Sequence, residues 1–182
     1  GRQFESVPVY QKMNKEKKLQ ASLPKGFKDR WGEELNLKNK LVDTIKDVFI
    51  NYSFEQLDTP EFEKSENIGS FLAEDETNPM SDVFSFVNEK ESLTLRYDLS
   101  APLARFCAEN FRDLVFPYKR FAYGNVFRQE KADSARFRSF AQLDADIIGD
   151  VNPSQADAEI CNIIGESFKK IGLTKDQFTI NV

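Results

Sequence analysis

Charged and amide side chains recur at every second position along two consecutive segments, residues 118–130 and 137–148. A period of two is typical of strands, whose successive side chains point to opposite faces of a sheet. If the segments pair as a long hairpin, one face carries a polar set: Arg120, Arg128, Glu130, Arg138, Gln142, Asp144 and Asp146. Burying such charges without a partner is costly. The face is therefore either exposed to solvent or occupied by a ligand.

The alternation leaves two interpretations of this polar face open. It could be the solvent-exposed side of an antiparallel sheet with cross-strand ion pairs, or it could be the floor of a pocket. Gly124 favours the pocket, because a glycine inside a strand often marks a position where a ligand or a backbone approaches closely. Phe121, Tyr123 and Phe127 alternate with the polar set, so the other face is predicted to be an aromatic core.

A second polar group precedes a predicted helix at residues 100–110. Asp98 and Ser100 lie in the segment Leu95-Arg-Tyr-Asp-Leu-Ser-Ala-Pro102, where a strand gives way to that helix. Ser100 is well suited to be the N-cap of the helix, and capping is the simpler explanation on local grounds. A carboxylate at the same junction could equally receive an ammonium group.

The rest of the chain predicts the elements that position these groups. Apolar residues at helical spacing indicate helices at 35–51, 100–110 and 153–171, the last opened by Pro153 and stopped by Gly172. Strands are predicted at 54–60, at 83–87 and 93–98 as a hairpin, and from 177 onward, with a surface loop at 69–81. Residues 1–22 form a polar arm, and residues 23–182 form one α+β domain whose antiparallel sheet is flanked by helices.

Composition removes several classes of function. The chain has 182 residues, two cysteines and no histidine. This excludes a disulfide framework, any imidazole base and any zinc site built on histidine, so we expect no protein-bound metal. We expect no membrane association and a cytoplasmic protein, since no apolar run is long enough to span a bilayer and no secretory signal is present. The net charge is −5, yet residues 111–138 contain seven basic and three acidic side chains, which suggests a local phosphate site.

These residues resemble the histidyl-tRNA synthetase family of class II aminoacyl-tRNA synthetases. Residues 23–29 are similar to the family's opening turn, residues 35–60 to motif 1, and Arg96-Tyr-Asp-Leu-Ser-Ala-Pro102 to its substrate loop. Phe127-Arg-Gln-Glu130, followed by Arg136-Phe-Arg-Ser-Phe140, is similar to motif 2, and Gln142-Leu-Asp-Ala-Asp146 follows it. The resemblance covers almost the whole chain after the arm.

The resemblance implies roles for four residues toward ATP, with Mg²⁺ carried by the nucleotide. Arg128 would bridge the α-phosphate and the amino-acid carboxylate, and so would be the catalytic residue. Glu130 would accept a hydrogen bond from the adenine amino group, Phe140 would stack on the adenine ring, and Arg136 would reach the γ-phosphate. No protein nucleophile is needed, which suits a chain without histidine.

Four more residues are implied to bind histidine. Asp98, Ser100 and Gln142 are similar to the family residues that hold the α-ammonium group. Asp146 occupies the position at which the family places an acidic residue against the imidazole ring. A carboxylate there favours a ring N–H donor, which apolar analogues lack.

The family's motif 3 and anticodon-binding domain would lie beyond Val182. The resemblance therefore implies the N-terminal part of a histidine–tRNA ligase that dimerises through residues 35–60, acts on tRNA(His), and is inactive or very weak as a 182-residue chain. Two alternatives stay open: a non-catalytic paralogue that regulates ATP phosphoribosyltransferase, and a dimerising interaction fragment without chemistry. The presence of Arg128, Glu130 and Arg136 together favours the synthetase.

Overall fold

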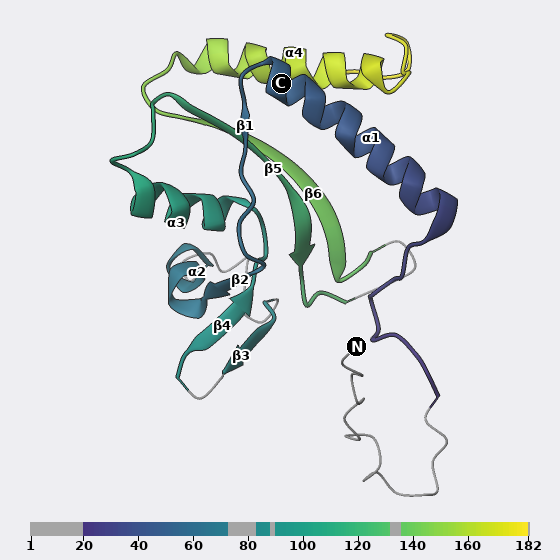
Figure 1. Cartoon of the computed structure of the whole chain (residues 1–182), viewed down its shortest axis with the longest axis vertical. Coiled ribbons are helices and arrows are strands. Elements are labelled where there is room, and N and C mark those ends of the chain that lie inside the picture. The colour runs from purple at the N-terminus through teal and green to yellow at the C-terminus, as the bar shows by residue number, and fades with distance from the viewer. Residues whose placement is uncertain (1–19, 73–82, 88–89, 132–135, 182) are drawn as a thin grey trace, which may run out of the picture.

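A long, curved hairpin forms the centre of the molecule (Figure 1). The computed structural model describes residues 20–72, 83–87, 90–131 and 136–181. The hairpin strands are β5 (Tyr118–Phe127) and β6 (Ser139–Ile148), and β1 (Glu55–Gln56) pairs in parallel with β5. The other elements are α1 (Gly32–Asn51), β2 (Phe62–Lys64), α2 (Ser65–Leu72), β3 (Ser85–Val87), β4 (Ser92–Leu95), α3 (Ser100–Asn110) and α4 (Pro153–Lys170).

The predicted α+β class is confirmed, and so is the predicted long hairpin. β5 and β6 are antiparallel, and their register runs from Tyr118 opposite Ile148 to Phe127 opposite Ser139. The predicted strands extended to residue 130 and began at residue 137, which is slightly too long. Pairing continues one step past β5, where the Arg128 amide donates to the carbonyl of Arg138 at 2.9 Å.

Helices α1 and α4 cover one face of the hairpin, as Figure 1 shows. The core on this face consists of five buried apolar side chains from α1, the segment after it, β5 and α4: Val48, Phe49, Phe54, Phe121 and Ile163. The rings of Phe49 and Phe121 stack with centroids 5.3 Å apart. Each such side chain contributes about 1.5–3 kcal/mol through burial. The predicted aromatic face is thus the one that fixes the hairpin to its helices.

The limits of α4 agree with the prediction, whereas the strand predicted after it is wrong. Asn152 caps the helix by accepting from the Gln155 amide at 3.3 Å, Pro153 is its first residue, and Gly172 ends it with a φ of +99°. Residues 177–181 have no strand partner among the described residues. Instead, the Phe178 ring packs edge-on against Phe168 of α4.

A smaller antiparallel sheet, in the order β2-β4-β3, lies beside α2 and α3. The hairpin predicted at residues 83–87 and 93–98 is confirmed by the antiparallel pairing of β3 with β4. Strand β2 was not predicted, and the loop prediction is wrong for residues 69–72, which complete α2. Packing of Ile68, which is 2% exposed, outweighs the weak helix propensity of the glycine and serine that follow it.

Parts of two predictions lie outside the described residues: the polar arm at 1–19 and the loop at 73–81. Residues 20–22, the last of the predicted arm, are exposed. Among the described residues, no helix has the length and apolar character required to cross a membrane.

Candidate functional site

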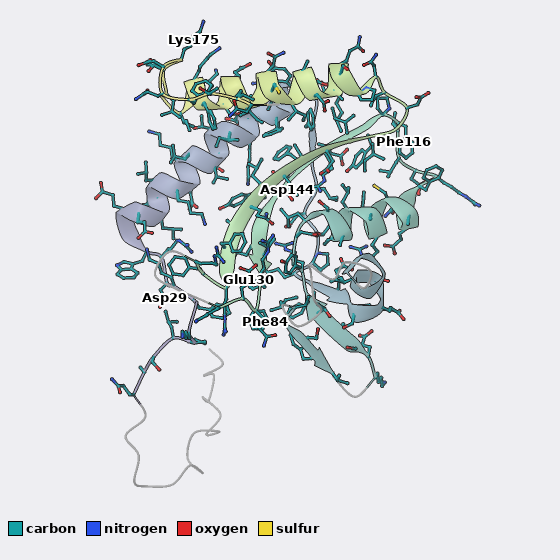
Figure 2. The ribbon with its side chains drawn as sticks, turned by 180° about the vertical axis from the view of Figure 1, so that it is seen from behind. Asp29, Phe84, Phe116, Glu130, Asp144 and Lys175 are labelled. Carbon is teal, nitrogen blue, oxygen red and sulfur yellow. The ribbon has the colours of Figure 1, made fainter. Side chains whose placement is uncertain are left out.

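The second face of the β5–β6 hairpin gathers the predicted polar residues. Gly124 lies opposite Gln142, Ala122 opposite Asp144, and Arg120 opposite Asp146, so that these pairs share one face. Figure 2 shows Asp144 at the middle of the hairpin and Glu130 at the end where its strands are joined. The predicted alternation therefore holds along the strands.

Arg128 lies just beyond β5 between two aromatic rings. Its guanidinium carbon is 4.3 Å from the centroid of the Tyr97 ring and 5.2 Å from that of Phe140. Its Nε also donates to the Tyr97 carbonyl at 3.4 Å, a long contact. Phe140 and Gln142 are two residues apart in β6, so their side chains share one face. Because Arg128 lies against the Phe140 ring, it is on the same face as Gln142. A cation held by two rings in this way is preorganised to meet a phosphate or carboxylate.

The structural role predicted for Ser100 is performed by Asp98. Asp98 Oδ1 accepts from the backbone amides of Ser100 and Ala101 at 3.1 and 2.9 Å, so this carboxylate caps α3. Ser100 is the first residue of the helix, and Leu99 is the N-cap position without a side-chain hydrogen bond. The prediction of Ser100 as the N-cap is therefore wrong, because a carboxylate two residues earlier reaches the same amides.

The middle of the polar face contains polar atoms without protein partners. Asp146 Oδ2 lies 2.7 Å from Arg120 Nη2, and the Arg120 side chain is fully buried. Among the described residues, Gln142 Oε1 and the Nε and Nη1 atoms of Arg120 are buried without a hydrogen-bond partner. Native proteins leave few such atoms, so their concentration here marks a place for a ligand or for ordered water.

Asp144 lies between Gln142 and Asp146 on this face, and the sequence did not assign it a role. Burial raises the pKa of its carboxyl, and the nearby negative charges of Asp146 and Asp98 add to the rise, while Arg120 and Arg128 oppose it. Three of these four charged neighbours, Asp98, Arg128 and Asp146, are predicted site residues, and Arg120 was predicted only to lie on the polar face. Asp144 thus belongs to the same polar cluster.

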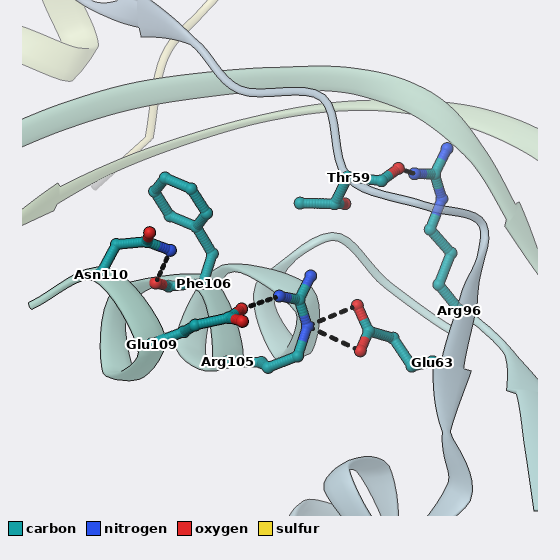
Figure 3. Close-up of polar contacts among 7 residues, drawn as sticks. All are labelled: Thr59, Glu63, Arg96, Arg105, Phe106, Glu109 and Asn110. Carbon is teal, nitrogen blue, oxygen red and sulfur yellow. Dashed lines mark hydrogen bonds and ion pairs between the residues drawn. The ribbon is translucent and has the colours of Figure 1, made fainter.

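The close approach predicted at Gly124 exists, but a side chain of the protein makes it. A Cβ atom at position 124 would collide with Arg96 Nη2. Arg96 is buried, and it donates from Nε to the Asn125 carbonyl and from Nη1 to the Thr59 carbonyl, each at 2.7 Å. Figure 3 shows the contact with Thr59. The interpretation of Gly124 as a mark of the ligand pocket is therefore wrong.

The other two predicted ATP-binding residues interact with each other. Arg136 Nη1 lies 3.7 Å from Glu130 Oε2, and the backbone carbonyl of Glu130 accepts from Arg138 Nε at 3.0 Å. Arg136 is largely exposed, so this long ion pair contributes little to stability. Both side chains lie at the strand-joining end of the hairpin, beyond Arg128.

A separate hollow of about 680 Å³ lies between α2 and α3, lined by Lys64, Glu66, Asn67, Arg105 and Glu109 among others. Arg105, one of its lining residues, is paired with carboxylates of the protein (Figure 3). Its Nε donates to both carboxylate oxygens of the buried Glu63, and its Nη1 donates to Glu109. None of the eight predicted site residues lines it. In the part of the chain that the structure describes, no cluster of three or more His, Cys, Asp or Glu could hold a metal ion.

A curved antiparallel hairpin, covered by helices on one face and bearing an arginine-centred polar set on the other, is the arrangement of a class II synthetase catalytic core. The family model for the class II core domain of tRNA synthetases matches residues 26–174. The chain belongs to this family. The resemblance inferred from the motifs is thereby confirmed.

The named relatives point to one branch of the family. The histidine–tRNA ligase of Pelagibacter ubique is 59% identical over 170 residues, which are 93% of this chain and 37% of that protein. The structure of histidyl-tRNA synthetase from Nostoc sp. PCC 7120 superposes with a TM-score of 0.71 at 32% identity, covering 82% of this chain and 34% of that one. The chain therefore spans about a third of the length of these relatives.

A further structural neighbour combines two names. It is described as an ATP phosphoribosyltransferase regulatory subunit/histidyl-tRNA synthetase from Bacillus halodurans. It superposes with a TM-score of 0.73 at 26% identity, over 87% of this chain and 40% of that one. The fold alone is thus compatible with both a ligase and its regulatory paralogue.

Proposed function

We propose that this chain is the N-terminal part of the catalytic domain of a histidine–tRNA ligase. The enzyme would activate histidine with ATP to histidyl-adenylate and transfer the histidyl group to tRNA(His). The observation that carries the proposal is the position of Arg128, which is held between Tyr97 and Phe140 on the same face as Gln142. The Pelagibacter relative supports the choice of histidine.

In the proposed activation step, a carboxylate oxygen of histidine attacks the α-phosphorus of ATP. A phosphorus–oxygen bond to histidine forms, the bond to the β-phosphate oxygen breaks, and pyrophosphate leaves with the electron pair. Arg128 would neutralise the negative charge that gathers on the α-phosphate oxygens and would orient the attacking carboxylate. Mg²⁺ would arrive with the triphosphate and supply further positive charge there.

The strand-joining end of the hairpin would bind the rest of ATP. Glu130 would accept from the adenine amino group, and Phe140 would stack on the ring. Arg136 would bind the γ-phosphate, for which its exposed position is favourable. In the structure, Glu130 and Arg136 form an ion pair at 3.7 Å, so ATP binding would have to separate them. The free-energy cost of this separation is small, because the pair is long and exposed.

Histidine would bind in the middle of the face. Asp98, Ser100 and Gln142 would hold the α-ammonium group, with the buried Gln142 Oε1 gaining the partner that it lacks among the described residues. Asp146 would accept from the imidazole N–H. Cap formation by Asp98 fixes this carboxylate at the start of α3, so the structural and the binding roles are compatible.

Dimerisation and tRNA binding are part of the same proposal. Leu37 and Ile50 of α1 are 57% and 54% exposed, and β1 is an edge strand in its sheet. Both features favour a homodimer contact through residues 35–60. The protein would work in the cytoplasm, and the 182-residue chain alone would be a very weak catalyst, because the resemblance places a further ATP-binding arginine in motif 3.

The regulatory paralogue is the alternative favoured by the Bacillus halodurans neighbour. An interaction fragment that only dimerises is the other. Both predict a protein without histidine-dependent chemistry, whereas the proposed ligase needs Arg128, Glu130 and Arg136. ATP binding separates them: a thermal shift at millimolar ATP supports the ligase.

The direct experiment is histidine-dependent exchange of pyrophosphate into ATP, measured on the full-length product of the gene that contains this sequence. We expect exchange by the wild type and a loss of at least a hundredfold in Arg128→Ala, on the order of 3 kcal/mol of transition-state stabilisation. Arg112→Ala, at an exposed arginine on the loop after α3, is the matched control and should exchange normally. Absence of exchange by the wild type would refute the proposal.

A further inference from the structure

Arg120 is a fully buried cation beneath the candidate histidine site. It lies opposite Asp146 in the register of β5 and β6, and Nη2 is 2.7 Å from Asp146 Oδ2. The same nitrogen donates to the Leu99 carbonyl at 3.1 Å. One end of this guanidinium therefore contacts both the carboxylate of β6 and the backbone at the start of α3.

Stabilisation of the fold alone does not account for this arrangement. An arginine stabilises a fold when carboxylates accept from its N–H groups, as the partly exposed Arg105 does through Nε to Glu63 and through Nη1 to Glu109. Nε and Nη1 of Arg120 have no hydrogen-bond partner among the described residues. Arg120 thus pairs with Asp146 while two of its buried nitrogen atoms lack hydrogen bonds, and burying a charge in this way costs stability.

The contact joins the two halves of the proposed histidine site. Leu99 follows Asp98, whose carboxylate would receive the α-ammonium group, and Asp146 would receive the ring N–H. The two carboxylates come from different parts of the fold, the turn before α3 and the C-terminal end of β6. Capping holds Asp98 and the strand register holds the backbone of Asp146, and Arg120 contacts both the Asp146 carboxylate and the backbone next to Asp98.

We propose that Arg120 is a positioning residue for histidine recognition, which fixes Asp146 relative to the Asp98 turn so that the two carboxylates match one amino acid. The inference rests on the proposed function. Arginine carries only donors, so it pairs with an oxygen of the Asp146 carboxylate. Oδ2 of Asp146 forms an ion pair with Arg120 but no hydrogen bond among the described residues, and Oδ1 would accept from the imidazole ring.

The test measures Michaelis constants in pyrophosphate exchange by the full-length gene product. Arg120→Gln should raise the KM for histidine at least tenfold and leave the KM for ATP within twofold. A purely structural role would change both constants alike, or neither. Lys119→Gln is the matched control: Lys119 is the neighbouring cation on the opposite face of β5, paired with Glu159 at 2.6 Å. It should leave both constants within twofold.

A double variant shows whether Arg120 acts through Asp146. Adding Arg120→Gln to Asp146→Asn should raise the KM for histidine no more than twofold beyond Asp146→Asn alone. If the two effects multiply in full, Arg120 acts independently of Asp146, and the inference is overturned.

A third variant covers the case in which Arg120→Gln fails to fold. Arg120→Lys keeps the charge but replaces the rigid planar guanidinium with a compact ammonium on a flexible stem, so the contacts with Asp146 and the Leu99 carbonyl are not held in the same geometry. It should raise the KM for histidine threefold or more with the KM for ATP unchanged, and equal constants to the wild type would overturn the inference. Wild-type exchange combined with an unchanged KM in the Arg120 variants refutes the inference alone. Lack of wild-type exchange refutes the proposed function and the inference with it.

Discussion

Two arginines, the partly exposed Arg105 on α3 and the fully buried Arg120 on β5, show how differently this protein treats its charges. Arg105 binds both oxygens of Glu63 and one of Glu109, and these hydrogen bonds raise its pKa, chiefly through Glu63. Arg120 leaves two of its donor atoms without a hydrogen-bond partner among the described residues. We call Arg105 with Glu63 and Glu109 the saturated cluster, because the arginine is paired with carboxylates of the protein. Arg120 with Gln142 and Asp146 is the unsaturated cluster, whose unpartnered atoms leave a place for a ligand or for ordered water.

This comparison predicts the largest loss of stability at the saturated cluster. Glu63→Ala leaves Arg105 without its main partner, so unfolding of the chain in urea should become easier by about 3 kcal/mol. Glu109→Ala removes the exposed partner of the same arginine and should cost no more than about 0.5 kcal/mol. Equal effects of the two variants would show that the buried pair does not hold β2 to α3.

Arg96 sharpens the comparison, because it lies near the site yet is bonded like Arg105. Gly124→Ala would push its guanidinium away from the Asn125 and Thr59 carbonyls, at a cost of about 2 kcal/mol in unfolding free energy. In an Arg96→Ala background the same alanine should cost less than about 1 kcal/mol. A full cost in both backgrounds would mean that the glycine serves another purpose.

Substitution of Asp144 should have the smallest effect on stability, and that effect should depend on pH. Its pKa is raised above the ordinary value of 3.8, mainly by burial, so ionisation of this carboxyl destabilises the folded state once the pH exceeds that value. Asp144→Asn should therefore unfold at a higher urea concentration than the wild type at pH 7. The difference should shrink as the pH falls and vanish well below 3.8, where the carboxyl is protonated in both the folded and the unfolded state. A difference independent of pH would contradict this account.

The sequence allowed prediction of the elements whose pattern is local. The period of two placed Gln142, Asp144 and Asp146 on one face, and Pro153 and Gly172 marked the ends of α4. Strand β2 and helix α2 could not be predicted, because three residues give no period and α2 depends on packing against distant elements.

Contacts between distant residues were also beyond the sequence. The glycine at position 124 indicated a close approach, but only the fold brings Arg96 there from 28 positions earlier in the chain. The pairing of Arg120 with Asp146 required the register, which alternation does not determine. Nor did the local pattern show that Asp98, rather than Ser100, caps α3, since both residue types are good caps.

The central claim is that the unsaturated cluster binds histidine and the saturated one does not. Calorimetric titration of histidine into the full-length gene product tests it on two variants. Gln142→Ala should lose at least tenfold in histidine affinity while its unfolding midpoint stays close to that of the wild type. Glu63→Ala should show the reverse, a lower midpoint with unchanged affinity for histidine at a temperature where it is folded. Unchanged affinity in Gln142→Ala, or equal losses of affinity in both variants, would contradict the account.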